Sequence, residues 1–535
     1  MSEGIITKVL SRRELFTQDA QYNQSFVLLF TIASSVIWIM IPGLAFLYSG
    51  LARRKSALAM IWIVIMSSFI GVFQWYFWGY SLAFSSTSNG FIGDLHYFGF
   101  RNLLGATTTE SDYPEIAFGL FQLQFLLVTL AILAGGCIAE RGRFLPAMVF
   151  LFCWATVVYC PVVNWIWGGG WAANYKSGVL DYAGGGPVEI LSGVSAFVYS
   201  AFLGRRNETL MINYRPHNIS TIFLGTSLLY VGWLFFNGFS CGNPSLKVAY
   251  SMMNTHICGA FGAISWCLLD FRLENKWSMV AVCSGCISGL VAATPSSGCI
   301  PLWASVILGI TAGVVCNLST KIKYLCRVDD SLDVLAEHGI AGVVGLLFNA
   351  LFGSATVLGY DNVTDHEGGW LDQNWKQLYI QIVYILATAA YSAVVTAILC
   401  FVINKIPGLH LRIDYNAEEV GIDEDQIGEF AYDYVEVRRD FLDWGNPTVN
   451  PTLQNSIIDQ HASMVVDGTH LTMVSSRRPE VYEATSLASH HENITDEKVD
   501  LEHDPQPYTP REKQDHHNQH NQQHTEVDTS SSSQS

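Results

Sequence analysis

Charged residues are scarce in this chain, and their scarcity excludes an ordinary soluble protein. Only 14% of the 535 residues are Asp, Glu, Lys or Arg, whereas 50% are hydrophobic. The polar surface is too small to cover the water-exposed exterior of a protein of this size, and the mean hydropathy of +0.27 agrees. A basic patch is also missing, so we expect no nucleic acid partner.

The motifs of common enzymes and metal sites are missing as well. No glycine-rich phosphate loop and no hydrolase nucleophile elbow stands in a strand-to-helix context. The twelve cysteines lie almost wholly in apolar runs, where they are small packing residues. Cys283 and Cys286 form a C-x-x-C pair without companion ligands, which argues against a metal or redox centre. We therefore expect neither an enzyme nor a cofactor.

What the chain does have is a series of long apolar runs between Ser25 and Lys405. A helix of about 20 apolar residues crosses a bilayer. We predict eleven such spans, at 26–50, 57–84, 115–138, 144–166, 187–204, 218–239, 248–270, 278–297, 301–324, 332–357 and 377–404. The sequence thus predicts an all-α polytopic membrane protein with a transmembrane domain over residues 25–405.

Lysine and arginine are concentrated in alternate loops, which predicts the orientation of the spans. These residues follow the odd-numbered spans one to nine: Arg53, Arg54, Lys55, Arg141, Arg143, Arg205, Arg206, Arg272, Lys276, Lys321, Lys323 and Arg327. Such loops mark the cytoplasmic side. Eleven spans then place the N-terminal segment, residues 1–24, outside and the C-terminus in the cytoplasm. Asn23, in Asn23-Gln24-Ser25, is a candidate external glycosylation site.

The chain after residue 405 has a different composition. It holds about 25 of the 46 acidic residues and about 8 of the 29 basic ones, which accounts for the net charge of −17. We predict a membrane-proximal regulatory segment over 406–440 and an acidic disordered cytoplasmic tail over 441–535. The stretch from Gly421 to Tyr434, which contains Glu429, Phe430 and Tyr432, is hypothesised to dock on the basic loops through its acids and aromatic rings.

Glu189 lies within predicted span five, and among the fifteen histidines only His256 and His338 fall within predicted spans, His338 in span ten. A carboxylate in hydrocarbon is costly unless it is neutralised, paired or lining a cavity, so Glu189 is a functional-site hypothesis. The alternative is an interfacial or bundle-facing acid. The acid of span five and the histidine of span ten are each followed four positions later by a glycine, Gly193 or Gly342, on the same helix face, where a small residue lets helices pack closely. This match favours a five-plus-five inverted repeat plus one extra helix, with the substrate path between the halves.

A glycine-rich stretch precedes Glu189. Gly184, Gly185 and Gly186 would let the backbone approach a neighbour closely. Asp181 stands just outside the helix mouth, where it can accept backbone N–H bonds and stay ionised.

Several longer motifs point to a known family. They are IPGLAFLYSGLARRK ending at Lys55, FQWYFWGYSLAF from Phe73, AERGRF from Ala139, DYAGG from Asp181, GWLFFNGFS from Gly232, and DDSLD ahead of His338. With these motifs the chain resembles the ammonium transporter (Amt/Mep/Rh) family, and within it the fungal ammonium permeases, over almost all of residues 25–434. The resemblance implies the ammonium-transporter fold and a homotrimer in which each subunit has its own pore.

The resemblance also implies roles for individual residues. It places an outer cation site on Trp167, Phe125 and Ser240, and a paired phenylalanine gate on Phe125 and Phe236. Aromatic faces attract ammonium by cation–π contacts worth about 0.5–2 kcal/mol. Without the resemblance, Trp167 would be interpreted as an aromatic residue of the membrane interface and Phe125 as a helix-packing residue. Asp181 matches an aspartate that organises the recruitment site.

Two positions depart from the common family pattern. Glu189 stands where most members have the first of two pore histidines, and only His338 is kept. A Glu–His pair titrates as a unit and holds a proton differently from a His–His pair. Glu337 is the second departure. Because adjacent helix residues point about 100° apart, we prefer an interior or interfacial role for Glu337 to a proton relay.

Together these features predict a plasma-membrane permease that imports ammonium and methylammonium, recruiting the cation, deprotonating it and passing it through an apolar pore. Its expected partners are the lipid bilayer, further copies of itself and cytoplasmic regulators of the tail. The alternatives are a passive NH3 channel of the Rh type and an ammonium sensor that signals through the tail. An intramembrane enzyme using Glu189 and His338 lacks a nucleophile or a metal triad.

Overall fold

The structure, a computed structural model, describes residues 24–103, 107–108, 111–211 and 215–432. These residues contain eleven helical segments long and apolar enough to span a membrane, which confirms the predicted number. Their bounds are Gln24–Leu51, Arg54–Phe84, Glu115–Ile138, Phe144–Asn174, Gly185–Leu203, Ile219–Cys241, Leu246–Glu274, Met279–Ser296, Leu302–Cys326, Leu335–Phe352 and Lys376–Lys405. Asn23 and the predicted tail over 441–535 lie outside the described residues.

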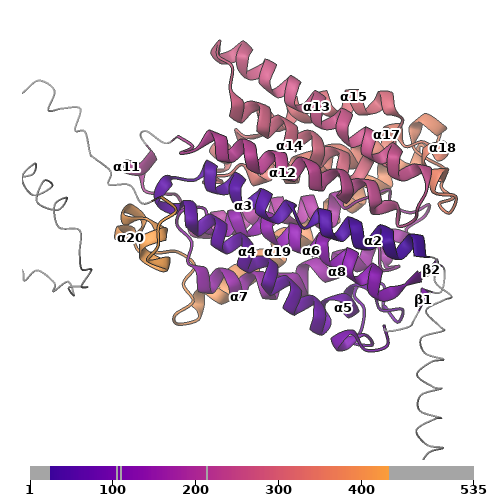
Figure 1. Ribbon diagram of the computed structural model, residues 1–535, viewed down its shortest axis with the longest axis horizontal. Helices are drawn as coiled ribbons and strands as arrows, with labels where there is room; N and C mark the ends of the chain where they lie inside the picture. Colours follow the sequence, from indigo (N-terminus) through magenta and orange to yellow (C-terminus); the bar gives the residue numbers. More distant parts are fainter. Residues whose placement is uncertain (1–23, 104–106, 109–110, 212–214, 433–535) are drawn as a thin grey trace, which may run out of the picture. The chain divides into compact units, whose positions relative to one another are not determined.

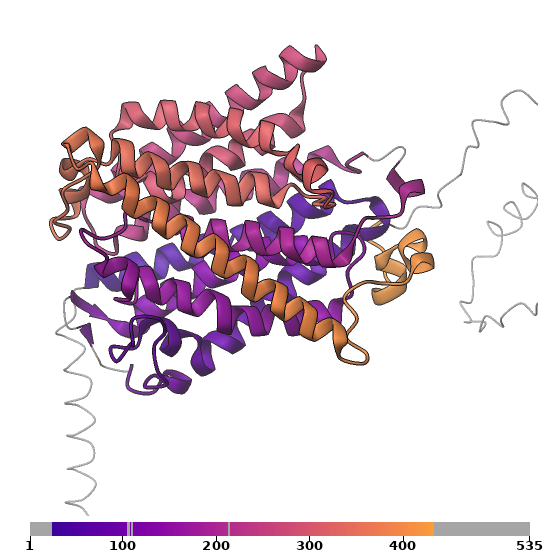
Figure 2. The same ribbon diagram turned by 180° about the vertical axis from the view of Figure 1, so that it is seen from behind.

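Several spans are built from more than one helix. Span one joins α2 (Gln24–Ile37) to α3 (Met40–Leu51), span two joins α4 (Ala57–Gln74) to α5 (Tyr80–Phe84), and span four joins α7 (Phe144–Trp154), α8 (Cys160–Ile166) and α9 (Trp171–Asn174). The others centre on α6 (Glu115–Ile138), α10 (Leu191–Leu203), α12 (Ile219–Gly238), α13 (Leu246–Glu274), α14 (Met279–Ser296), α15 (Leu302–Ser319) with α16 (Ile322–Cys326), α17 (Ala341–Phe352) and α19 (Lys376–Lys405). Figure 2 shows α19 running obliquely across the other spans.

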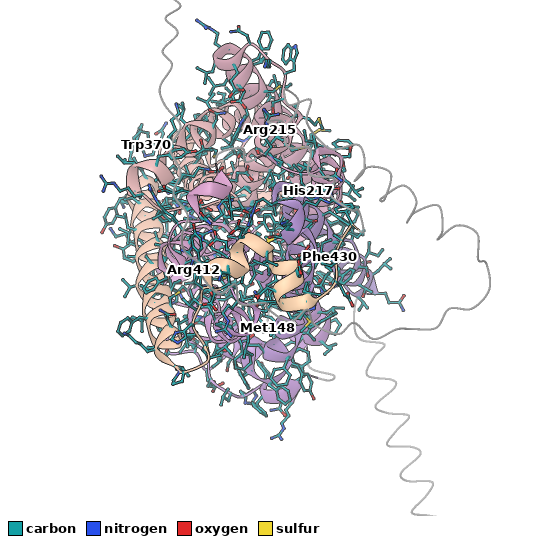
Figure 3. The ribbon with its side chains drawn as sticks, turned by 90° about the vertical axis from the view of Figure 1, so that its left-hand side faces the viewer. Met148, Arg215, His217, Trp370, Arg412 and Phe430 are labelled. Atoms are coloured by element: carbon teal, nitrogen blue, oxygen red, sulfur yellow. The ribbon has the colours of Figure 1, made fainter. Side chains whose placement is uncertain are left out.

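The connecting segments gather at two ends of this bundle (Figure 1). One end carries α18 (Ala355–Leu358) and a small antiparallel pair of strands, β1 (Thr107–Thr108) and β2 (Ser111–Pro114). The opposite end, which we call the basic end, carries α11 (Glu208–Met211) and α20 (Tyr415–Val420). Figure 3 views the basic end, where the chain that includes Arg412 and Phe430 lies between Met148 and His217.

Buried ion pairs hold the loops of the basic end together. Arg206 binds both Glu140, at 2.7 Å, and Asp329, at 2.8 Å. Arg141 is fully buried and donates to the carbonyl oxygens of Gly204, at 2.7 Å, and Asp329, at 2.7 Å. Burial lowers the pKa of Arg141 to about 10. These arginines, read from sequence only as orientation signals, are also structural parts of the loops.

Spans five and ten cross at the glycines singled out in the sequence. A Cβ atom added at Gly193 would stand 2.4 Å from the backbone nitrogen of Gly339, and one at Gly342 would stand 2.8 Å from the Cβ of Glu189. Both distances are shorter than real Cβ contacts, so the two helices touch through glycine. The close packing expected after Glu189 and after His338 is therefore present at both places.

We expect Gly193→Ala to destabilise this crossing, because the added methyl group meets the rigid backbone of Gly339. Overpacking of a filled interior costs about 1–3 kcal/mol. Thermal unfolding of the purified protein in detergent measures the effect, and Gly90→Ala, where the space is open but φ is +84°, serves as a control for backbone strain alone. A Gly193→Ala variant as stable as the wild type would contradict the crossing.

Candidate functional site

Glu189 of span five and His338 of span ten meet inside the bundle. His338 Nδ1 lies 2.8 Å from Glu189 Oε2, and both side chains are buried. Each residue stands in a π-helical segment that opens its span, η6 (Gly185–Ile190) for Glu189 and η8 (Leu335–Ile340) for His338. The second oxygen of Glu189, Oε1, has no hydrogen-bond partner among the described residues. The pair therefore has one buried carboxylate oxygen that can accept a further hydrogen bond.

Two residues that the sequence did not single out support this pair. The ring of Trp233 stacks on the imidazole of His338, with centroids 6.4 Å apart and planes inclined by 25°. Its indole N–H donates to the Thr294 hydroxyl at 2.8 Å. Trp233 could have been singled out from the sequence because it lies in the motif GWLFFNGFS. Nothing in the sequence distinguishes Thr294 from the other threonines of the spans.

The proposed gate residues are in ring contact. Phe125 and Phe236 have centroids 4.1 Å apart, with planes inclined by 36°, and both side chains are fully buried. Phe125 also meets Trp167 edge-on at 5.5 Å, and Phe236 lies 6.2 Å from Trp233. An unbroken aromatic column thus runs from Trp167 through the two phenylalanines and Trp233 to His338.

Ser240 follows one turn after Phe236. Its hydroxyl donates to the Phe236 carbonyl at 2.7 Å, so its proton is used within its own chain. The oxygen lone pairs remain as the groups that a cation can approach. The Trp167 indole N–H in turn lies 3.4 Å from the Asp181 carbonyl.

Asp181 holds the start of span five. Its carboxylate accepts the backbone N–H groups of Gly184, Gly185 and Gly186 at 3.1, 2.6 and 2.7 Å, and the Tyr384 hydroxyl at 3.1 Å. Burial raises the pKa of Asp181, and these donors oppose that shift. The hydrogen bonds expected at the helix mouth are present, and they leave the carboxylate little capacity to bind a cation directly.

Asp330 is the counterpart of Asp181 in the second half. Each stands eight positions before the residue of the pair on its own span, Asp181 before Glu189 and Asp330 before His338. Asp330 accepts the N–H groups of Val334 at 3.3 Å and Leu335 at 3.0 Å, and burial raises its pKa to about 6. Sequence reasoning missed Asp330, although the equal spacing within DDSLD could have revealed it.

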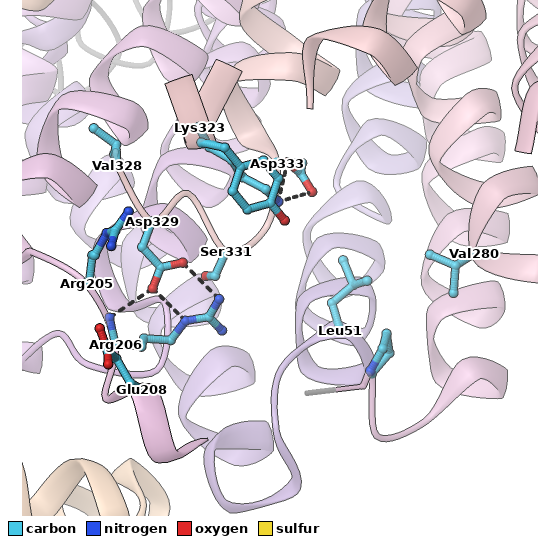
Figure 4. Close-up of a pocket in the computed structure, with 12 residues that line it drawn as sticks. Leu51, Arg205, Arg206, Glu208, Val280, Lys323, Val328, Asp329, Ser331 and Asp333 are labelled. Carbon is cyan, nitrogen blue, oxygen red and sulfur yellow. Dashed lines mark hydrogen bonds and ion pairs between the residues drawn. The ribbon is translucent and has the colours of Figure 1, made fainter. Parts of the chain in front are cut away.

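A cavity of about 480 Å³ opens at the basic end. Two ion pairs line it, Asp329 with Arg206 and Asp333 with Lys323, the latter at 2.7 Å (Figure 4). Burial acts to raise the pKa of Asp329, but its bonds to Arg206 outweigh that effect and lower the pKa to about 2. Burial raises the pKa of Asp333, against the opposing charge of Lys323. The cavity walls are therefore charged, unlike the aromatic column.

The membrane-proximal segment docks on the basic end by contacts that differ from the predicted ones. Asp423 accepts the backbone N–H groups of Leu58 at 3.0 Å and Ala59 at 2.7 Å, in the first turn of α4. Burial raises the pKa of Asp423, and the backbone donors oppose this. The prediction that its acids meet lysine and arginine is wrong for Asp423, because a helix N-terminus presents unpaired N–H groups and attracts anions.

The aromatic part of that prediction is confirmed at one position and wrong at another. The Tyr432 hydroxyl accepts a bond from Asn218 at 3.2 Å, and its ring lies 5.4 Å from that of His217. Phe430 is 55% exposed, and Glu429 is exposed too. Gly421 has φ +115° and lies against Lys55, where a Cβ would stand 2.5 Å from the lysine Cβ, so this position requires glycine.

We expect Asp423→Ala to loosen the segment from the basic end, because it removes the anionic partner of two α4 N–H groups. Loss of such a cap costs about 0.5–2 kcal/mol. Limited proteolysis of purified protein should then cleave after residue 405 several-fold faster, while Glu429→Ala, an exposed acid of the same segment, should cleave as the wild type does. Equal cleavage of all three proteins would contradict the docking.

Comparisons with known proteins agree with this architecture. The family model described as Ammonium Transporter Family matches residues 28–432. The chain is 61% identical over 430 residues to Ammonium transporter MEP3 of Saccharomyces cerevisiae, covering 80% of this chain and 87% of that protein. It is 60% identical over 427 residues to Ammonium transporter MEP1 of the same yeast, covering 79% of this chain and 86% of that protein.

Solved structures show the same likeness. The crystal structure of Saccharomyces cerevisiae Mep2 superposes with a TM-score of 0.70 at 42% identity, covering 74% of this chain and 92% of that one. The crystal structure of Candida albicans Mep2 gives 0.71 at 40% identity, covering 75% and 88%. These relatives are transport proteins and not enzymes. The chain therefore belongs to the ammonium transporter family and is an ammonium transporter of the Mep type.

Proposed function

We propose that this protein is a plasma-membrane permease that imports ammonium and methylammonium by separating the cation into a proton and a neutral amine. The observation that carries the proposal is the 2.8 Å contact between His338 and Glu189 at the inner end of the aromatic column. An apolar constriction keeps a charged cation from passing. A proton acceptor directly behind it can take up the cation's proton, so that the neutral amine passes alone.

Recruitment takes place at the outer end of the column. Trp167 is only half-buried, and its ring and that of Phe125 provide π faces, while Ser240 provides an oxygen. Cation–π attraction of about 0.5–2 kcal/mol suits an ion of the size and charge of ammonium. Asp181 acts as a positioning residue, because its oxygens are already occupied by the backbone of the helix that carries Glu189.

The selectivity for ammonium over potassium follows from the ability of ammonium to release a proton. Moving a bare ion through an apolar constriction such as the Phe125–Phe236 contact costs several kcal/mol more than moving a neutral molecule. Ammonium avoids that cost by leaving its proton with the Glu189–His338 pair. Potassium has no proton to leave, so it is rejected despite its similar size.

We further propose that the N-terminus is extracellular, that the basic end is cytoplasmic, and that three subunits assemble. The alternating arginine and lysine loops support the orientation. An exposed polar pair supports assembly: the Tyr230 hydroxyl and His256 Nδ1 lie 2.8 Å apart on the surface of spans six and seven. Polar groups facing lipid are costly, so a neighbouring subunit is the favoured cover. Residues 406–440 are the regulatory segment.

A flux assay in proteoliposomes tests the function. Vesicles containing the purified protein should take up labelled methylammonium in a saturable manner and should exclude labelled rubidium, a potassium surrogate. Rubidium uptake at a rate similar to that of methylammonium would contradict deprotonation as the basis of selectivity.

Two alternatives make different predictions. A passive NH3 channel of the Rh type would show uptake without charge movement. A sensor that signals through its tail would need the docked segment for signalling, and truncation before Gly421 would then abolish the growth response while leaving uptake intact.

Trp167→Leu should weaken recruitment without unfolding the protein. Loss of the aromatic face should cost about 1–2 kcal/mol, or roughly tenfold in the apparent affinity for methylammonium. Trp375→Leu is a matched control, since Trp375 is 65% exposed and follows the 3-10 turn Trp370–Asp372, away from the column. Unchanged concentration dependence in the Trp167 variant would return this residue to the role of an interfacial anchor.

A further inference from the structure

Two acids lie one helical turn apart at the start of span ten, between His338 and the basic end. The Glu337 N–H donates to the Asp333 carbonyl at 2.9 Å, so the two residues occupy successive turns of one helix face. Glu337 is 7% exposed, whereas the Asp333 side chain is 28% exposed. The face thus leads from the bundle interior toward water.

Glu337 is buried without a countercharge in contact. No ion pair to it occurs among the described residues, although burying an isolated carboxylate is costly. The groups close enough to influence it come from several elements and comprise Ser284 and Cys283 of α14, Cys316 of α15, Tyr48 of α3, Asp330, Asp333 and Lys323. A carboxyl group in such a place is stable when protonated and able to give the proton up toward a polar neighbour.

Tyr48 lies near both the Glu189–His338 pair and these acids. Its buried hydroxyl is within electrostatic range of Glu189, Glu337 and Asp330. The hydroxyl makes only a long contact of 3.5 Å to the Ile132 carbonyl, which leaves it free to rotate toward another acceptor. A hydroxyl can accept one proton and donate another, so Tyr48 is suited to bridge the two sets of groups.

The acids lead to the cavity at the basic end. Asp333 and its partner Lys323 line that cavity, and so does Ser331, whose buried hydroxyl has no hydrogen-bond partner among the described residues (Figure 4). A volume of about 480 Å³ with charged walls is large and polar enough to hold water. A proton that reaches Asp333 is therefore at the solvent boundary.

We propose that Glu337 relays the proton from the Glu189–His338 pair to this cavity. The inference rests on the proposed function. Ammonium gives its proton to the pair and continues as NH3. The pair passes that proton, through the Tyr48 hydroxyl and intervening water, to the Glu337 carboxylate, which becomes a carboxylic acid. Glu337 then releases it by way of Asp333 to cavity water and returns to the carboxylate, so one NH3 and one proton reach the same side.

The side chains of Glu337 and His338 point in different directions from the helix. In the sequence this favoured an interior role for Glu337, but it also lets Glu337 carry the proton away from the path of NH3. His338 contacts Glu189, while Glu337 lies close to Ser284 of α14. The proton and NH3 therefore leave the pair by different faces of one helix. A route separate from the apolar path spares the proton a second passage through hydrocarbon.

The test measures charge and substrate together. Proteoliposomes with Glu337→Gln should keep the wild-type KM for methylammonium, because recruitment occurs at the other end of the column, while the charge moved per methylammonium should fall at least several-fold. Asp333→Asn should reduce the ratio in the same direction, and Glu337→Asp, which retains a carboxyl group, should restore part of it. Glu274→Gln, an exposed acid at the end of α13, is the matched control and should match the wild type.

The outcomes separate the two proposals. If Glu337→Gln moves as much charge per methylammonium as the wild type, the relay is overturned. If that variant does not fold, an unchanged ratio of charge to methylammonium in Asp333→Asn, whose side chain is partly exposed, overturns the relay instead. A wild-type protein that takes up methylammonium without moving charge contradicts the proposed function itself.

Discussion

The His338→Ala variant is expected to lose nearly all ammonium uptake and to be clearly less stable than the wild type. The substitution leaves the Glu189 carboxylate buried without its 2.8 Å partner, and breaking a buried pair in this way costs about 3–5 kcal/mol. It also removes the ring on which Trp233 stacks, which leaves a cavity beside Trp233. Uptake per reconstituted protein and thermal unfolding in detergent measure the two effects.

His256→Ala provides the matched control for that experiment. His256 also lies in a span, but it is exposed and pairs with Tyr230 away from the column. Its replacement should leave uptake within about twofold of the wild type, whereas His338→Ala should lose nearly all uptake. Uptake by His338→Ala close to the wild-type rate would show that the pair takes no part in transport.

The second large effect concerns the acid of the pair. Glu189→Gln keeps the size of the side chain but cannot exchange a proton, so uptake should fall and its dependence on external pH should flatten. Glu189→His should remain active with a shifted pH optimum, because the common family pattern carries histidine at this position and two imidazoles share a proton differently from a carboxylate and an imidazole.

Uptake measured across a range of external pH distinguishes these variants. The control is Glu274→Gln, which changes an exposed acid at the end of α13. Superimposable pH profiles for the wild type, Glu189→Gln and Glu189→His would show that Glu189 does not handle the proton.

The spans and the contact between Glu189 and His338 were accessible from the sequence for physical reasons. A helix that crosses a bilayer must be apolar over its whole length, so composition alone locates it. The same constraint makes Glu189 and His338 conspicuous, because ionisable groups are rare there. The glycines four residues later marked a contact that the structure shows between Gly193 and Gly339 and between Gly342 and Glu189.

Other parts of the site could not be read in advance. Thr294 looks like an ordinary span residue, and although Trp233 lies in a family motif, only the packing of spans six, eight and ten shows that it stacks on His338. The docking of Asp423 was misjudged because charge pairing was expected, whereas its partners are backbone N–H groups, which every residue but proline carries and which no sequence pattern reveals. Asp330 could have been found only from its spacing to His338, which equals the spacing of Asp181 to Glu189.

The most direct test of the central claim is an electrical recording on the wild-type protein. Purified protein is reconstituted into vesicles on a sensor surface and exposed to a rapid ammonium pulse, then to an equal potassium pulse. Deprotonation at the Glu189–His338 pair with return of the proton on the far side predicts an inward positive current with ammonium and none with potassium. Ammonium uptake without current, or an equal potassium current, would contradict it.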